Sequence, residues 1–393
     1  MYGEDTDSSS DDSLIDKLVN DFILDDTDAY IIATVKPKIM SKPKEAIVKS
    51  NFWSDVYPLL SDNAFKSRYR RSRESFNSFA EQHFARSPYK NMQRWIKALS
   101  ITIDYLSTGV RVQDLVLLYD SAQGKIFMDI DCCISFLEKC VLPLVCQWPD
   151  EVERGHLAAL NWIKYKMPMC LGAIDGTLVK IKGYQPNRKE LNCRKSHFAY
   201  NVLLVCDFNG LIRFYVCGSP GAMSDVTIYE ESDLFANLAE WLKNSNRLTH
   251  PFYLISDKGI PNTDYIVTPF PDDGRLSAQQ LRFNYIVQSA RSIIERVNGI
   301  FKQRYQILNR VLAVNTERKA QSVIKACLAL YNDEIIRGDL KLYSQKPDLE
   351  ENSVISMFNE YDRSPYVNQF SGSREFLYDF IHKNVQEQLR LEE

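Results

Sequence analysis

A chain of 393 residues with a formal net charge of −3 is long enough for two compact domains, and its 45% hydrophobic and 25% charged residues are ordinary for a globular protein. No apolar run reaches the ~20 residues of a membrane-spanning helix and no signal-peptide pattern begins the chain, so we expect a soluble intracellular protein without a membrane partner. Nine cysteines without a CxxC pair and five scattered histidines exclude a zinc ribbon or zinc finger and favour reduced thiols.

The first segment of the chain is acidic. Residues 1–28 carry ten acids against one base, Lys17, which leaves 47 bases and 41 acids in the rest. Such a composition is typical of disorder, so we predict an acidic disordered tail over residues 1–35. The tail either competes with nucleic acid for a basic surface or only keeps the protein in solution.

Residues 50–155 are predicted to form a helical region. Its segment 65–76 mixes five bases with aromatic residues, which suits either phosphate contacts or a solvated helix face. Three helices are expected after it, over residues 95–106, 112–119 and about 128–145, and the first ends at Thr108-Gly109.

The last two of these helices resemble a helix-turn-helix, in which the second helix would enter the DNA major groove. The start of that helix contains Asp129 and Asp131, which would repel phosphate. A helical support domain and a DNA-reading domain therefore both remain open.

The pattern changes to strands at about residue 167. Strands are expected over residues 170–182, 199–206, 211–217 and 252–256, with a hairpin at Asn209-Gly210 and a break at residues 218–221. A helix is predicted over residues 226–242, and a later one carries Glu295. This order of elements indicates an α/β core over residues 165–340, in which the third strand is antiparallel to the second.

The C-terminal part repeats the helical pattern over residues 320–336. We predict a linker and a C-terminal helix within residues 341–393, with the helix near residues 375–391.

Three acids stand out within the α/β core. Asp175 interrupts an apolar strand, Asp257 ends the apolar run of the fourth strand, and Glu295 lies in a polar stripe of its helix. Three clustered carboxylates would not all stay ionised without a compensating charge, and Mg²⁺ or Mn²⁺ bound by oxygen ligands would supply it. Two such ions roughly 3.5–4 Å apart can activate water or a 3′-hydroxyl against a phosphodiester. The pattern therefore favours a metal-dependent nuclease.

Each acid also has a structural explanation. Asp175 could cap a turn before Gly176, Asp257 could be an ordinary turn acid, and Glu295 could pair with Arg291 or Arg296 on a helix surface. Asp225 by itself would be read as the N-cap of the following helix.

Bases flank the acids in the sequence, and they could hold DNA phosphates, with a solvated loop as the alternative for those after the first strand. These candidate DNA-binding residues are Lys180, Lys182, Arg188, Lys189, Arg194, Lys195, Arg291, Arg296, Lys302 and Arg304.

Residues from about 171 to 332 resemble the DDE nuclease domain of PIF/Harbinger transposases and the Harbinger transposase-derived nucleases. The matching segments occur in family order, and Leu99 to Thr108 resembles the helical region of the family. They are Ala173-Ile174-Asp175-Gly176-Thr177, Arg194-Lys195 with Asn201, Pro220-Gly221 with Asp225, Asp257-Lys258-Gly259-Ile260-Pro261, Phe283-Asn284, and Ile294-Glu295-Arg296 with Gly299, Lys302 and Arg304.

The resemblance implies an RNase H-like mixed sheet with flanking helices, preceded by an all-helical helix-turn-helix-like region. It implies a catalytic DDE triad of Asp175, Asp257 and Glu295, with Asp225 as a further metal ligand and Mg²⁺ or Mn²⁺ as cofactor. It also implies DNA as substrate, a separate Myb/SANT-like partner protein, and a nuclear location with a cytoplasmic stage before import. A homo-oligomer is a further option.

The chain departs from the family pattern at a few positions. Lys258 stands where a small residue is usual, Ile260 where an aromatic is usual, and Asp129 and Asp131 where serine and threonine are common. The sequence thus predicts a metal-dependent DNA endonuclease that could also perform strand transfer. The alternatives are a domesticated, non-cutting DNA or chromatin adaptor and an interaction module that recruits partners through its termini.

Overall fold

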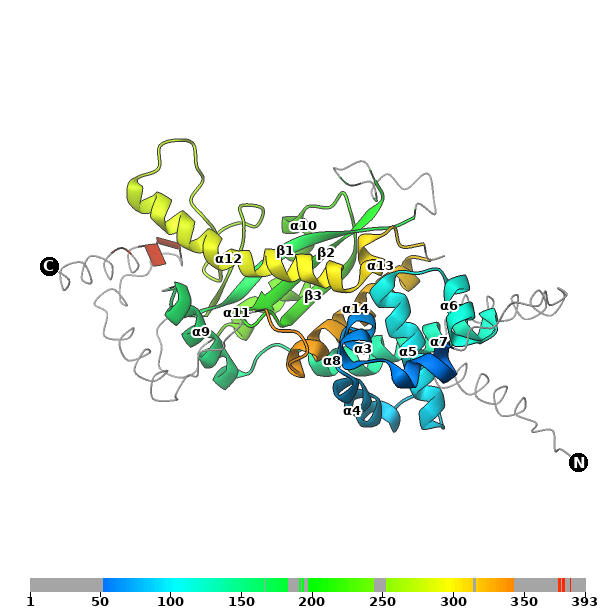
Figure 1. Cartoon of the computed structure of the whole chain (residues 1–393). Helices are drawn as coiled ribbons and strands as arrows, with labels where there is room; N and C mark the ends of the chain where they lie inside the picture. The colour runs from blue at the N-terminus through cyan, green and yellow to red at the C-terminus, as the bar shows by residue number, and fades with distance from the viewer. Residues whose placement is uncertain are drawn as a thin grey trace, which may run out of the picture. The chain divides into compact units, whose positions relative to one another are not determined.

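The computed structural model divides the chain into two compact units, Met1–Phe136 and Leu137–Glu393 (Figure 1). The residues that the structure describes are 52–165, 167–182, 191, 193, 197–243, 252–313, 316–342, 374–375, 377–378 and 382. The predicted acidic tail, most of the C-terminal segment, and Arg188, Lys189, Arg194 and Lys195 lie outside them. No helix of the described ranges has both the length and the apolar character needed to cross a membrane.

The first unit is helical throughout its described part. Its helices are η1 (Phe52–Val56), η2 (Tyr57–Leu59), α3 (Asp62–Tyr69), α4 (Arg73–Phe84), α5 (Met92–Thr108), α6 (Val112–Tyr119) and α7 (Gln123–Phe136). Serine or asparagine side chains cap α3, α4 and α5, and α5 ends at Gly109 in the left-handed conformation, as the Thr108-Gly109 pair predicted.

The basic segment 65–76 faces the interior of this unit more than it faces solvent. Phe65 and Phe76 are fully buried, and Arg71 is buried with its guanidinium over the Phe79 ring. Arg68 pairs with the buried Asp104 of α5. These arginines therefore help to hold the helices together, a use that the sequence pattern alone did not reveal.

Asp129 of α7 is also buried. Its carboxylate accepts hydrogen bonds from Tyr89 and Arg94, at 3.0 Å each, and only 1% of the residue is exposed. Burial raises the pKa of Asp129, and the Arg94 charge opposes that rise. The expected repulsion between Asp129 and DNA phosphate does not apply to a side chain that is enclosed in this way, whereas Asp131 is exposed.

The second unit contains a five-stranded mixed sheet in the order β3-β2-β1-β4-β5. β1 is central, antiparallel to β2 and parallel to β4, and β2 is antiparallel to β3. The strands are β1 (Cys170–Lys180), β2 (Ala199–Asp207), β3 (Ile212–Pro220), β4 (Tyr253–Ile255) and β5 (Ile266–Val267). This arrangement with its flanking helices is the predicted RNase H-like α/β fold.

The sheet is flanked by helices, of which α12 is the longest in the described ranges. α12 lies across β1 and β2 (Figure 1), and it begins at a capping box in which Ser277 and Gln280 bond reciprocally. The helices of this unit are η3 (Leu137–Val141), α8 (Leu142–Val145), α9 (Glu151–Tyr165), α10 (Asp225–Glu230), α11 (Asp233–Trp241), α12 (Ala278–Arg304), α13 (Gln306–Asn309) and α14 (Glu317–Ile336).

Three details differ from the expected elements. The third strand continues to Pro220 instead of breaking at residue 218, because its last residues still pair with Tyr200 and Asn201 of β2. The expected helix over residues 226–242 is two helices, α10 and α11, because Ser232 caps a second start. Strand β5 was not predicted, since two residues between prolines give no periodic signal.

Candidate active site

Asp175 and Asp257 are brought together by the register of two parallel strands. Ala173 of β1 pairs with Ile255 of β4, and each aspartate lies two residues beyond its paired residue. Since β4 ends at Ile255, Asp257 stands in the loop at the carboxyl end of the strand. Its Oδ1 atom accepts the Gly259 N–H at 2.7 Å, which fixes the turn that follows. Asp175 itself lies in the middle of β1, which continues to Lys180.

Helix α12 adds three polar side chains beside Asp175. Asn298 donates from Nδ2 to Asp175 Oδ2 at 3.0 Å. The Arg291 guanidinium lies 3.8 Å from Asp175 Oδ1 and donates to Glu295 Oε1 at 2.5 Å. These residues follow one another at intervals of four and three, so one face of the helix presents all of them.

Asp225 approaches the same strand at the next residue. A Cβ atom built on Gly176 would lie 2.1 Å from Asp225 Oδ1, a distance that no side chain could tolerate. Asn201 of β2 donates from Nδ2 to Asp225 Oδ1 at 2.6 Å. Ser224 is the N-cap of α10 and Asp225 is its first residue, which differs from the cap role considered for Asp225.

The electrostatics of Asp175 show that four acids share this region. Burial raises the pKa of Asp175 to about 6, and the Arg291 guanidinium opposes that rise. The negative charges of Asp257, Asp225 and Glu295 also contribute to this raised pKa of Asp175. Asp225, Asp257 and Glu295 thus lie within electrostatic reach of Asp175, and these four residues are the acid cluster of this unit.

The chemistry of this donor set fits a hard divalent cation. Carboxylate and amide oxygens are the ligands that Mg²⁺ and Mn²⁺ prefer. Asn298 Oδ1 is buried beside Asp175 and has no hydrogen-bond partner among the described residues, so the site contains a polar atom that requires one. Across the same described ranges, no three His, Cys, Asp or Glu side chains are gathered at the spacing of a metal site.

The predicted DNA-binding bases have different surroundings. Lys180, Lys182 and Arg296 are exposed. Lys302 Nζ donates to the backbone oxygen of Leu178 at 2.8 Å, which ties α12 to β1. Arg304 pairs with the buried carboxylate of Glu334 on α14 and so contributes to the core of the unit.

Asn201 and Asn298 were not among the predicted site residues. Asn201 is a buried polar residue directly before an apolar run of its strand, residues 202–206, and a polar residue in an apolar strand is the signal that identified Asp175. Asn298 lies three residues after Glu295 in the polar stripe. Both amides orient a carboxylate by donating to it, a role that residue type alone does not indicate.

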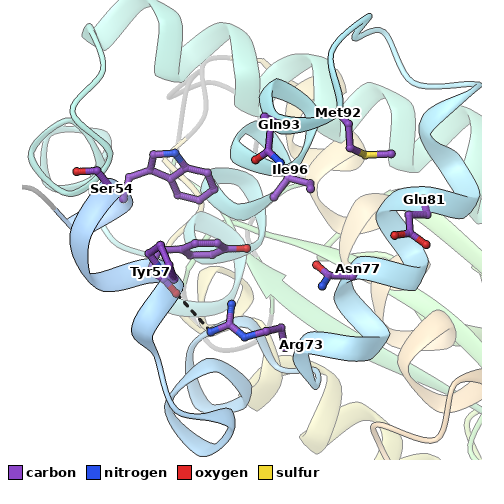
Figure 2. Close-up of a pocket in the computed structure, with 10 residues that line it drawn as sticks. Ser54, Tyr57, Arg73, Asn77, Glu81, Met92, Gln93 and Ile96 are labelled. Carbon is purple, nitrogen blue, oxygen red and sulfur yellow. Dashed lines mark hydrogen bonds between the residues drawn. The ribbon is translucent and has the colours of Figure 1, made fainter.

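The first unit contains a cavity of about 660 Å³ that has a different character. Trp53, Tyr57, Met92 and Ile96 line it, and Figure 2 shows Tyr57, Met92 and Ile96 among the side chains of its wall. Arg73 lies on the wall of this cavity, and its guanidinium donates a hydrogen bond to the backbone oxygen of Tyr57 at 3.3 Å. This lining offers no cluster of acids comparable to that of the second unit.

Comparison with known proteins identifies the second unit. Residues 174–332 match the family described as DDE superfamily endonuclease, so the chain carries a DDE superfamily endonuclease domain. The match begins within β1, one residue before Asp175, and ends at Asn332, so it covers the rest of the sheet, α12 and most of α14. No solved structure matches the chain.

The chain is also a distant homologue of Harbinger transposase-derived proteins. It is 25% identical over 209 residues to "Putative nuclease HARBI1" of Mus musculus, covering 50% of this chain and 57% of that protein. It is 24% identical over 226 residues to "Protein ALP1-like" of Arabidopsis thaliana, covering 52% and 55%. Its identity to "Putative nuclease HARBI1" of Xenopus laevis is 28% over 196 residues, covering 47% and 53%. The matched region is little more than half the length of each relative.

Replacing Gly176 by alanine should displace Asp225. The added methyl group would overlap the Asp225 carboxylate, and the Asn201 hydrogen bond would be lost with it. We expect divalent-cation affinity to fall by about 10–100-fold, the range seen when residues that support metal ligands are changed. Calorimetric titration with Mn²⁺ measures this. Gly299→Ala, on the exposed side of α12 with nothing within 4 Å of its Cβ position, serves as the control.

Proposed function

We propose that the second unit is a divalent-metal-dependent DNA endonuclease. The observation that carries this proposal is the buried Asp175, on which the charges of Asp257, Asp225 and Glu295 act, inside a DDE superfamily endonuclease domain. Asp175, Asp257 and Glu295 are the proposed catalytic triad and, with Asp225, the proposed ligands of Mg²⁺ or Mn²⁺. Strand transfer at the same site is an extension of this proposal.

The side chains of the domain position the ligands. Asn298 donates a hydrogen bond to one oxygen of Asp175, and Asn201 donates one to an oxygen of Asp225. Both carboxylates are therefore oriented before a cation binds. The bound ion would supply an activated water or 3′-hydroxyl and offset the negative charge of the phosphodiester. The exposed Lys180, Lys182 and Arg296 are proposed to bind DNA phosphates beside the acids.

A plasmid-nicking assay tests the proposal. The full chain is incubated with supercoiled DNA in Mg²⁺, Mn²⁺ or EDTA, and relaxed circles are quantified. We expect nicking with either cation and none with EDTA. Glu295→Gln keeps the shape of the side chain while removing its charge, and it should nick far more slowly. Nicking that is independent of the divalent cation would contradict the assignment.

A non-cutting DNA or chromatin adaptor is the second candidate. It is favoured by the ion pairs of Arg291 with Asp175 and Glu295, because a guanidinium can neutralise acids that serve only the fold. An adaptor would bind DNA with a strong salt dependence and yield no relaxed circles in the nicking assay.

Location and partners follow from the proposed substrate. A DNA endonuclease of this kind would act in the nucleus, and a Myb/SANT-like partner would bring it there and to its target. Co-purification of tagged protein from nuclear and cytoplasmic fractions tests both proposals.

A further inference from the structure

Arg291 lies between two of the proposed metal ligands. It contacts Asp175 on β1 and Glu295 one turn along its own helix, and its side chain is only 17% exposed. Among the described residues, the ion pairs of Asp175 and of Glu295 both come from this one guanidinium. The positive charge is therefore inside the acid cluster and not on the outer surface of α12.

We propose that Arg291 and the divalent cation compete for the same carboxylate oxygens, and that the cation binds only when the guanidinium swings out towards the DNA backbone. This inference rests on the proposed metal-dependent function. Arg291 would then offset the repulsion among the acids when no cation is bound and contact a phosphate when one is.

The contacts of Asp175 show where the exchange would occur. Its Oδ2 atom accepts the Asn298 amide, and its Oδ1 atom faces Arg291 at 3.8 Å. Departure of the guanidinium would free Oδ1, while Asn298 would keep the carboxylate in its present orientation. The amide of Asn298 is neutral and cannot replace the positive charge of Arg291. The ammonium of Lys302 donates to the backbone oxygen of Leu178, so it would not move to Asp175 when Arg291 leaves.

The side chain of Arg291 can leave at little cost. Its contact with Glu295 is an i to i+4 pair, a weak interaction when one partner is accessible, and Glu295 is 57% exposed. Four rotatable bonds allow the guanidinium to reach outward from the helix. Arginine binds phosphate oxygens through two parallel N–H donors, so a DNA backbone entering the site would hold the displaced group.

Cation binding without DNA tests the competition. Binding of Mn²⁺ to the full chain is measured by calorimetry for the wild type, Arg291→Gln and Arg282→Gln. The control removes the same charge from an exposed position of α12, nine residues before Arg291. We expect Arg291→Gln to bind Mn²⁺ about tenfold more tightly, since each 1.4 kcal/mol changes affinity tenfold. Arg282→Gln should match the wild type, and Asp175→Asn should lose this binding.

The outcomes separate the two proposals. Wild-type binding with equal or weaker binding by Arg291→Gln overturns the competition and leaves the metal-dependent function standing. Binding of Mn²⁺ by none of the proteins overturns both. Melting in EDTA checks that each variant is folded. If Arg291→Gln does not fold, Arg291→Lys provides the test, because a single ammonium cannot bridge both carboxylates and should give an intermediate gain in affinity.

DNA binding tests the second half of the exchange. Duplex affinity is compared with Ca²⁺, a hard cation that oxygen ligands also accept, and with EDTA. Arg291→Gln should lose several-fold more affinity in Ca²⁺ than in EDTA, because only the displaced guanidinium reaches a phosphate. An equal loss in both conditions would overturn the exchange.

Discussion

Asp175→Asn is expected to reduce divalent-dependent nicking by more than about 100-fold while the protein stays folded. A change in a residue that only supports a metal ligand typically costs 10–100-fold, so loss of a ligand should cost more. Asparagine matches aspartate in shape and removes a charge whose burial is unfavourable, since burial raises the pKa of Asp175 to about 6. Stability should therefore be equal or higher. Nicking rates and melting curves give both results.

The control for this variant is Asp233→Asn. Asp233 is an exposed acid in the first turn of α11, so the substitution removes the same charge elsewhere in the unit. It should nick at the wild-type rate. DNA affinity of Asp175→Asn at low salt should be unchanged, because the exposed bases are intact. Equal nicking by Asp175→Asn and the wild type would refute the assignment of Asp175.

Glu334→Ala is expected to destabilise the second unit by about 3–5 kcal/mol, the usual cost of breaking a buried ion pair. Glu334 of α14 is fully buried, pairs with Arg304 and accepts the Tyr305 hydroxyl at 2.7 Å. Alanine would remove the buried carboxylate that pairs with the largely buried guanidinium of Arg304 and accepts the Tyr305 hydroxyl. Urea unfolding followed by circular dichroism measures the loss.

The exposed pair of Glu240 and Lys243 provides the comparison. Its atoms are 3.7 Å apart and both side chains are mostly exposed, so Glu240→Ala should cost less than about 1 kcal/mol. Equal effects of the two substitutions would contradict the structural role given to Arg304. That role also explains why Arg304→Gln should weaken the fold before it affects DNA binding.

Much of the fold was predictable because its elements carry periodic signals. The apolar run around Asp175, the Asn209-Gly210 hairpin and the polar stripe of α12 each predicted an element that the structure contains. Strand β5 and the division between α10 and α11 were missed. They depend on pairing with a neighbour and on a serine cap, and neither produces a repeating pattern.

The four acids of the candidate site stand out in the sequence as residues, but their arrangement does not. Sequence order cannot reveal that Ala173 pairs with Ile255, which is the register that brings Asp175 beside Asp257. Sequence order also cannot distinguish Arg304, which pairs with a buried glutamate, from the exposed Arg296, because both are bases on one helix. Such assignments depend on tertiary contacts, which residue type does not specify.

Helix α12 joins the acid cluster to the core over a single uninterrupted stretch. Arg291, Asn298 and Lys302 meet β1, and Arg304 meets α14. Inserting or deleting one residue would rotate everything beyond it by about 100°, since a helix has 3.6 residues per turn. The rotation would break the hydrogen bond of Asn298 to Asp175 and the ion pair of Arg304 with Glu334 together. The length of this helix is therefore constrained by two unrelated sets of contacts, and changes in chain length between related proteins should fall in the loops on either side of it.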